Sequence, residues 1–238
     1  MLVHEQWGWP LPRPALDRVV ERFSSRLLVV DRVDSADFGF RRLDYAQVAE
    51  VVSLSKTLGL LGGGLARRVS GYTPFHSTTE TAGTRHALER LASGSTSEPY
   101  REFFKNSSQA IHPAVSTWAA THSIMASLED ERMLRQRNVR LVQASPLANG
   151  WPGWMDAAMS RGAGPGLAPV LRGCEPDTWT KVMRLLAERF ETASTVGVFN
   201  WTGDPLAPAY EACLLIPVHG EMQHVAEVVR SVVALLEL

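Results

Sequence analysis

Short apolar runs alternate with segments of helical pattern through the first part of the chain. Leu27 to Asp31 is an unbroken apolar run that ends on a carboxylate, and it follows residues 14–26, where apolar positions recur at helical spacing behind a proline. A run of this kind is typical of a strand buried in a parallel sheet. Glu50 to Ser53 and Gly64 to Val69 are two more such runs, and residues 43–50 are interpreted as a short helix or loop between strands. Three strands with crossover segments predict an α/β sheet.

The second half of the chain has longer helical patterns. A long helix is predicted after Pro113, because apolar residues recur three and four apart. Its arginine-rich end is favourable at a helix C-terminus and is interpreted as a solvated face. Residues 144–173, rich in Gly, Pro, Ala and Trp, are interpreted as a connection between lobes. An amphipathic helix capped by Asp177 or Thr178, two strands and a closing helix from Met222 onward predict a small α+β lobe.

Composition narrows the class of protein. The 238 residues are 45% hydrophobic and 21% charged, which is ordinary for a globular chain with ample core. The net charge of −1 argues against a nucleic-acid binder, and no apolar run approaches the length of a membrane span. The N-terminus lacks the pattern of a signal peptide, and the two cysteines and seven histidines show no metal-site spacing. We therefore expect a soluble cytoplasmic protein without a metal.

Lys56 is the residue that most needs an explanation. The chain has only three lysines, and this one follows the run that ends at Ser53. A lysine at the end of a buried strand is costly unless it is paired or used, and its amine is a candidate nucleophile. Pyridoxal phosphate would also need a carboxylate at its ring nitrogen and donors for its phosphate. Asp31 ends the preceding strand, so parallel neighbours would bring Asp31 and Lys56 to one sheet edge, with Ser53 and Ser55 as phosphate donors.

The same residues carry a resemblance to a known superfamily. The segment S-L-S-K-T-L-G-L-L-G-G-G-L-A resembles the pyridoxal-phosphate attachment signature of class I and II aminotransferases, which have fold type I. Upstream, L-L-V-V-D-R-V-D-S-A-D-F resembles the strand that ends in the aspartate paired with the ring nitrogen. The arginine-ended helix, and L-L-I-P-V-H-G-E-M with its closing helix, resemble parts of the DegT-like sugar aminotransferases. The resemblance implies that Lys56 is the Schiff-base lysine, Asp31 the pyridinium partner and Ser53 a phosphate ligand.

Two positions depart from the pattern of the family. The signature usually carries an arginine, a phosphate ligand, where this chain has Gly64, and Arg67 or Arg68 is the nearest replacement. The aspartate strand usually continues to a tyrosine that contacts the ring hydroxyl, and Asp34 occupies the nearest position here. Arg67 is therefore a candidate cofactor ligand that the signature itself does not supply.

The resemblance covers only the C-terminal half of the family's fold. In the family, a long cofactor-binding region precedes the lysine, whereas 55 residues precede Lys56. We therefore expect a partial large domain in residues 1–110, a connecting helix in 111–143 and a small α+β domain in 144–238. A separately encoded N-terminal-half chain would complete the fold as a heterodimer, through a large apolar interface that includes Trp7 and Trp9.

The function that the resemblance implies is transfer of an amino group between an amino acid and a keto substrate in biosynthetic metabolism. Lys56 would hold the cofactor and then act as general acid and base. Lyase, decarboxylase or carbon–carbon bond-forming chemistry on the same cofactor stays open. Two other interpretations stay open as well: a non-catalytic half that stabilises or regulates a partner, and an exposed lysine in a plain turn. Asp34 and Asp37 are interpreted as solvated loop charges, and Trp201 as a core residue.

Overall fold

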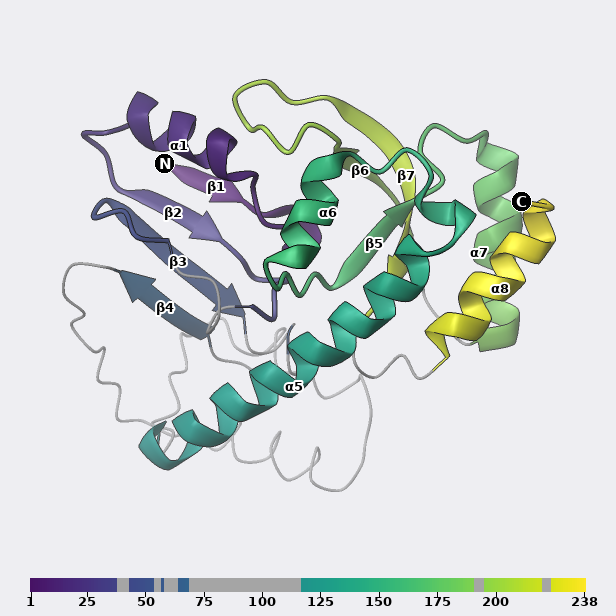
Figure 1. Ribbon diagram of the computed structural model, residues 1–238, viewed down its shortest axis with the longest axis horizontal. Helices are drawn as coiled ribbons and strands as arrows, with labels where there is room; N and C mark the ends of the chain where they lie inside the picture. The colour runs from purple at the N-terminus through teal and green to yellow at the C-terminus, as the bar shows by residue number, and fades with distance from the viewer. Residues whose placement is uncertain (38–42, 54–56, 58–63, 69–116, 191–194, 220–223) are drawn as a thin grey trace, which may run out of the picture.

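A computed structural model describes most of the chain outside one long segment. The described residues are 1–37, 43–53, 57, 64–68, 117–190, 195–219 and 224–238. They form a mixed α/β structure with two small sheets and five α-helices. Figure 1 shows the four-stranded sheet at one end, helices α7 and α8 at the other, and the long helix α5 running between the two ends.

The four-stranded sheet has the order β1-β2-β3-β4, and its first three strands are parallel. The strands are β1 (Leu2–His4), β2 (Leu28–Asp31), β3 (Val48–Ser53) and β4 (Gly64–Arg68). The three strands expected from the sequence are confirmed, with small shifts at their ends. β1 was not expected, because three residues are too few to display a pattern.

β4 departs from the expected strand–crossover–strand arrangement, because it runs antiparallel to β3. Gly64 pairs with Ser53 in the register, so the two strands meet at the point where β3 ends. A parallel crossover takes about a dozen residues or more, and the connection from Ser53 to Gly64 is shorter. The length of this connection therefore favours a hairpin-like return.

One face of the parallel strands is covered by helix α1 (Arg13–Arg22). The helix begins with a proline in its first turn, which suits the fixed φ of that residue. Its buried face packs against alternate residues of the strands, as period-2 side-chain alternation requires. The apolar residues in this cluster include Leu16, Val19, Val3, Leu28, Val30 and Val48.

The rest of the described chain builds a second lobe, the C-terminal lobe, around the antiparallel sheet β5-β7-β6. Its elements are α5 (Thr117–Gln143), η2 (Pro146–Ala148), α6 (Gly153–Ser160), β5 (Leu167–Val170), α7 (Pro176–Phe190), β6 (Thr195–Asn200), β7 (Tyr210–Pro217) and α8 (Val225–Leu236). Both expected strands and the closing helix are confirmed. The boundaries of the three expected domains stay predictions.

Two details of this lobe were predicted wrongly. Residues 144–173 are not a bare connection, because they contain η2, α6 and the strand β5. These elements are short, so each carries little pattern. β5 also contains Pro169, which is uncommon within strands but is tolerated here because β5 lies at the edge of its sheet. Helix α7 begins at Pro176, so Asp177 lies in its first turn and is not the N-cap.

Trp9, a few residues after β1, belongs to the core of the second lobe. Trp9 follows the short 3₁₀ helix η1 (Gln6–Gly8) and is 2% exposed. Its Nε1 donates to the carbonyl of Leu167 at 2.8 Å, and its ring meets Trp151 and Trp154 edge to face. The expectation that Trp9 faces a partner chain is therefore wrong, since an aromatic ring of this size fills the lobe's own core. Trp201 is buried as expected.

Candidate functional site

The structure places two of the predicted site residues at one edge of the four-stranded sheet. Asp31 is the last residue of β2 and Ser53 the last of β3, and these strands are parallel neighbours. Asp31 pairs with Val51, so Ser53 lies two residues farther along β3, about 7 Å at the usual rise of a strand. The carboxyl ends of parallel strands are where open α/β sheets bind ligands.

The carboxylate of Asp31 is accessible and oriented by its neighbours. Its side chain is 23% exposed. Oδ1 accepts a hydrogen bond from the backbone N–H of Val33 at 3.1 Å. Oδ2 lies 3.4 Å from Nδ1 of His4, the residue opposite Asp31 in the register of β1. The edge therefore presents a fixed carboxylate with an imidazole beside it.

Lys56 and Ser55 lie outside the described residues, but the residue that follows the lysine is described. Thr57 is 3% exposed. Its hydroxyl donates to the carbonyl of Val33 at 3.4 Å, and its own carbonyl accepts from Nη2 of Arg135 at 3.2 Å. Val33 belongs to the segment that follows β2, residues 32–37, which we call the β2 loop. Thr57 is thus bonded to the loop that begins beside Asp31.

The backbone of Arg67 lies some distance from this edge, and its role as a cofactor ligand stays a prediction. The register of the β3–β4 pair sets Arg67 opposite Glu50, whereas Gly64 is opposite Ser53. The backbone of Arg67 therefore lies three residues, about 10 Å, away from the pair at the edge. Gly64 holds the position where the signature has its arginine, so the structure offers no replacement there among the described side chains.

A buried charge cluster beneath the edge was missed by the sequence reasoning. The guanidinium of Arg32 is fully buried, lies 3.3 Å from Glu5 and donates to Glu50 at 2.9 Å and to Asp37. Asp37, which also accepts from the hydroxyl of Ser35, is 1% exposed. The expectation of a solvated Asp37 is wrong, because its oxygens are occupied within the cluster. We call these four charged residues the Arg32 cluster.

A sequence signal for this cluster did exist. Glu50 shares the alternation of Val48 and Val52, both buried on β3. Period 2 therefore places the Glu50 side chain on the buried face. A carboxylate on that face needs a cation, and the residue after Asp31 is an arginine.

Arg135 was assigned to a solvated helix face, and that assignment is wrong. It is 2% exposed, although Arg137 and Arg140 on the same helix are exposed as expected. The guanidinium of Arg135 donates to backbone carbonyls of three segments and to Glu131 on its own helix. A run of arginines on a helix conceals such a buried member, because the pattern alone does not distinguish them.

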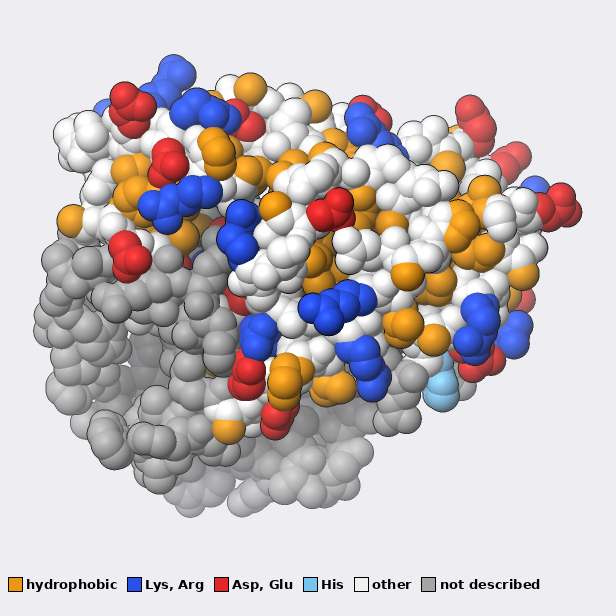
Figure 2. All heavy atoms as spheres, viewed as in Figure 1, with side chains coloured by type: hydrophobic (Ala, Val, Ile, Leu, Met, Phe, Trp, Pro, Cys, Tyr) orange, Lys and Arg blue, Asp and Glu red, His pale blue; other side chains and the backbone are white. Residues whose placement is uncertain are grey.

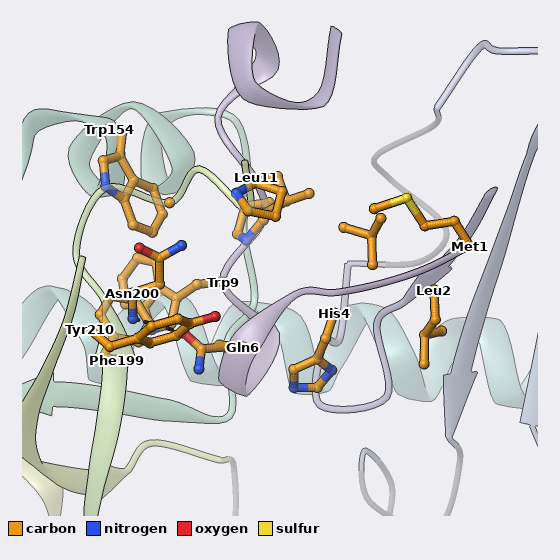
Figure 3. Close-up of a pocket in the computed structure, with 14 residues that line it drawn as sticks. Met1, Leu2, His4, Gln6, Trp9, Leu11, Trp154, Phe199, Asn200 and Tyr210 are labelled. Atoms are coloured by element: carbon orange, nitrogen blue, oxygen red, sulfur yellow. Dashed lines mark hydrogen bonds between the residues drawn. The ribbon is translucent and has the colours of Figure 1, made fainter. Parts of the chain in front are cut away.

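A groove lies beside the open side of β1. It encloses about 290 Å³ and is lined by β1, by aromatic residues and by the connection that follows β6. Figure 3 shows His4 of β1 facing this space, with Trp9, Phe199 and Tyr210 grouped across from it. His4 therefore stands between the groove and Asp31.

Neither a group of side chains that would hold a metal ion nor a helix that would span a membrane is found in the described part of the chain. It contains no group of three or more His, Cys, Asp or Glu side chains that would hold a metal ion. No helix there combines the length and the apolar character of a membrane span. Acidic and basic side chains are interspersed over the face in Figure 2, which fits the net charge of −1.

A comparison with models of known protein families finds no match, and neither does a comparison with curated proteins.

Proposed function

We propose that this chain is the lysine-bearing part of a pyridoxal-phosphate-dependent enzyme of the aminotransferase type. The observation that carries the proposal is the shared edge, where Asp31 and Ser53 end parallel neighbouring strands. Thr57, the residue after Lys56, adds to it through its bond to the loop that begins beside Asp31. The resemblance of the Lys56 segment and the geometry of the edge are independent supports.

The described residues fit such a cofactor. Asp31 offers a partly exposed carboxylate that the N–H of Val33 orients, which suits a partner for a ring nitrogen. Ser53 stands at the same edge, in reach of a phosphate bound there, and Ser55 is the second proposed donor. Bound pyridoxal phosphate supplies an electron sink for bonds at an amino acid's α-carbon.

The roles of the chain's own residues follow from their chemistry. The amine of Lys56 would hold the cofactor and, once the substrate has displaced it, would take the proton from the α-carbon of the substrate as general base and return it to a second carbon as general acid. Asp31 would favour the protonated ring nitrogen. We propose amino transfer between an amino acid and a keto substrate in biosynthesis. Cys174 and Cys213 are free thiols, which suits the reducing cytoplasm that we propose as its location.

We further propose that a separately encoded chain adds to the outer side of β1. β1 pairs only with β2 in the part of the sheet that is described. Leu2 on this strand is 65% exposed and lines the groove beside it. Three parallel strands with one open apolar edge are a template for another strand. Such a strand would bring the remaining cofactor contacts to the same sheet.

Gly64 favours a second candidate function, a non-catalytic half that stabilises or regulates a catalytic partner. It lies opposite Ser53 at the edge, where the signature's arginine would bind phosphate. A chain without that ligand would bind the cofactor weakly by itself. The two functions differ in whether Lys56 bonds the cofactor at all.

An absorbance titration with pyridoxal phosphate tests the proposal. We expect a band near the visible edge in the wild type and in the control Lys181→Ala, and none in Lys56→Ala. Asp31→Asn should bind about ten- to a hundredfold more weakly, because a charge-assisted bond is lost. The titration is run with the chain alone and with its co-expressed neighbour. A band that needs the neighbour supports the split enzyme, and the absence of a band in both conditions rejects the enzymatic function.

A further inference from the structure

One buried guanidinium joins Thr57, the residue after Lys56, to both lobes. We infer that Arg135 is a positioning residue, which transmits the placement of the C-terminal lobe to Thr57 and the β2 loop. The inference goes beyond the proposed function and rests on it only where the chemistry of Lys56 is concerned. Its structural part stands on described contacts alone.

The contacts of Arg135 reach three segments of the chain. Nη1 donates to the carbonyl of Asp34 in the β2 loop at 2.8 Å, and Nη2 donates to the carbonyl of Thr57 at 3.2 Å. Nη1 also lies 3.4 Å from the carbonyl of Gly164, in the loop between α6 and β5. The fork geometry of a guanidinium is what allows one side chain to hold these carbonyls together.

The orientation of the guanidinium is itself fixed. Nε donates to Glu131, one turn earlier on α5, and the Arg135 side chain is 2% exposed. The bonds to Gly164 and Thr57 are buried and the bond to Asp34 is partly buried, so loss of the guanidinium removes a charged donor from all three carbonyls. Arg135 therefore acts on Thr57 and the β2 loop through direct bonds.

The loop between α6 and β5 packs closely against this bond. A Cβ built on Gly166 would lie 3.3 Å from Nη1 of Arg135 and 3.2 Å from the carbonyl of Asp34. The N–H of Ala36 donates to the carbonyl of Gly164 at 2.9 Å, and the N–H of Val218 donates to that of Gly166 at 3.0 Å. A shift of the C-terminal lobe would therefore move Arg135 and the β2 loop together.

Two substitutions disturb the bond from opposite sides. Arg135→Gln removes the donors to Thr57 and Asp34, and its control is Arg137→Gln at an exposed position of the same helix. Gly166→Ala keeps the guanidinium but crowds it, and its control is Gly153→Ala, where a Cβ meets nothing within 4 Å. Arg135→Lys is included because it keeps the positive charge but lacks the planar set of donors of the guanidinium.

Amide hydrogen exchange of the full chain, followed by mass spectrometry, reads out the coupling. We expect peptides that contain Thr57 and residues 32–37 to exchange about tenfold faster in Arg135→Gln and in Gly166→Ala, as the loss of one charge-assisted bond predicts. Arg135→Lys should restore part of the protection. Peptides from α8 should exchange no faster, relative to wild type, than they do in the two controls. A general loss of stability would instead raise the exchange rate everywhere.

Labelling separates this inference from the proposed function. The rate and pH profile with which pyridoxal phosphate and borohydride modify Lys56 should change in Gly166→Ala, while modification of Lys181 stays the same. Wild-type exchange at Thr57 in either variant overturns the role of Arg135. If Lys56 is unlabelled in the wild type, the proposed function fails, and the exchange experiment still decides whether Arg135 positions this segment.

Discussion

Arg32 sits among three carboxylates that come from different parts of the chain. Glu5 follows β1, Glu50 lies within β3 and Asp37 ends the β2 loop. The cluster holds together the strand ends that carry Asp31 and Ser53. Sequence reasoning found those two edge residues because strand ends are visible in an apolar pattern. It missed Arg32, because the signal for a buried cation lies on another strand, in the buried position of Glu50 on β3.

Replacing Arg32 tests the importance of this cluster. Arg32→Met keeps the bulk of the side chain but leaves the carboxylates without that guanidinium. We expect a loss of about 3–5 kcal/mol in the free energy of unfolding, measured by urea denaturation. Arg189→Met is the control, because Arg189 and Glu227 form a half-exposed pair whose removal costs at most about 1 kcal/mol. Equal losses in the two variants would contradict the account of a buried cluster.

Arg18 and Asp204 provide a pH-sensitive contact between the lobes. Burial by itself would raise the pKa of Asp204, but bonds from Arg18 and from backbone N–H groups, including that of Leu206, outweigh it and hold the pKa below its ordinary 3.8. The stabilisation is therefore present above pH 3.8 and is lost as the pH falls through the lowered pKa.

Substitution of Arg18 should flatten this dependence. In Arg18→Gln, we expect the urea midpoint to fall less steeply than in the wild type as the pH is lowered from about 5 to about 2. Arg13→Gln serves as the control, because its pair with Asp17 lies within α1 and joins no lobes. Identical acid slopes in the wild type and Arg18→Gln would show that the contact contributes nothing to acid stability.

At the scale of elements, the predictable strands were those with a long apolar pattern. β2, β3, β6 and β7 follow from runs of apolar residues, and α7 and α8 from helical spacing. β1 and β5 were missed because three or four residues carry too little pattern, and β5 contains a proline, Pro169, which is uncommon within strands. The direction of β4 depends on the length of its connection to β3, which an apolar run does not display.

Gly8 tests the contact between η1 and the β2 loop. It has φ +83°, and a Cβ there would overlap the carbonyl of Asp34 and lie 2.9 Å from Cα of Pro165. Gly150 has φ +86° with nothing within 4 Å, so Gly150→Ala measures the backbone cost alone, about 1–2 kcal/mol. We expect Gly8→Ala to destabilise the protein by clearly more in thermal or urea unfolding. Equal costs would mean that the two segments are not in close contact.

At the scale of the molecule, the lobes are interlocked rather than joined by a single connection. Trp9 lies in the core of the C-terminal lobe, although β1 just before it belongs to the other sheet. Arg135, Arg18 and Gly166 add contacts across the same boundary. A pattern of apolar residues describes one segment at a time. It therefore indicated two lobes, but not the residues that make contacts between them.

The two thiols report on the integrity of the C-terminal lobe. Burial raises the pKa of Cys213 on β7 to about 12, and burial together with Glu175 raises the pKa of Cys174. We expect Cys174 to react with a disulfide reagent in the native protein, because it is only partly buried. The reaction should be slow near neutral pH, because the raised pKa leaves little thiolate. Cys213 should react only when the whole lobe unfolds, with the denaturant dependence of global unfolding. Rapid modification of Cys213 in the native protein would show that the lobe opens locally.

We propose above that Lys56 and Asp31 act on one bound pyridoxal phosphate. The most direct measurement is borohydride reduction of the chain with the cofactor, alone and with its co-expressed neighbour, followed by peptide mapping in the wild type and Asp31→Asn. We expect the label on the peptide that contains Lys56, with Lys105 and Lys181 unmodified. Asp31→Asn should take up much less label. Labelling spread over all three lysines, or labelling of Lys56 that is unchanged in Asp31→Asn, would contradict a shared cofactor site.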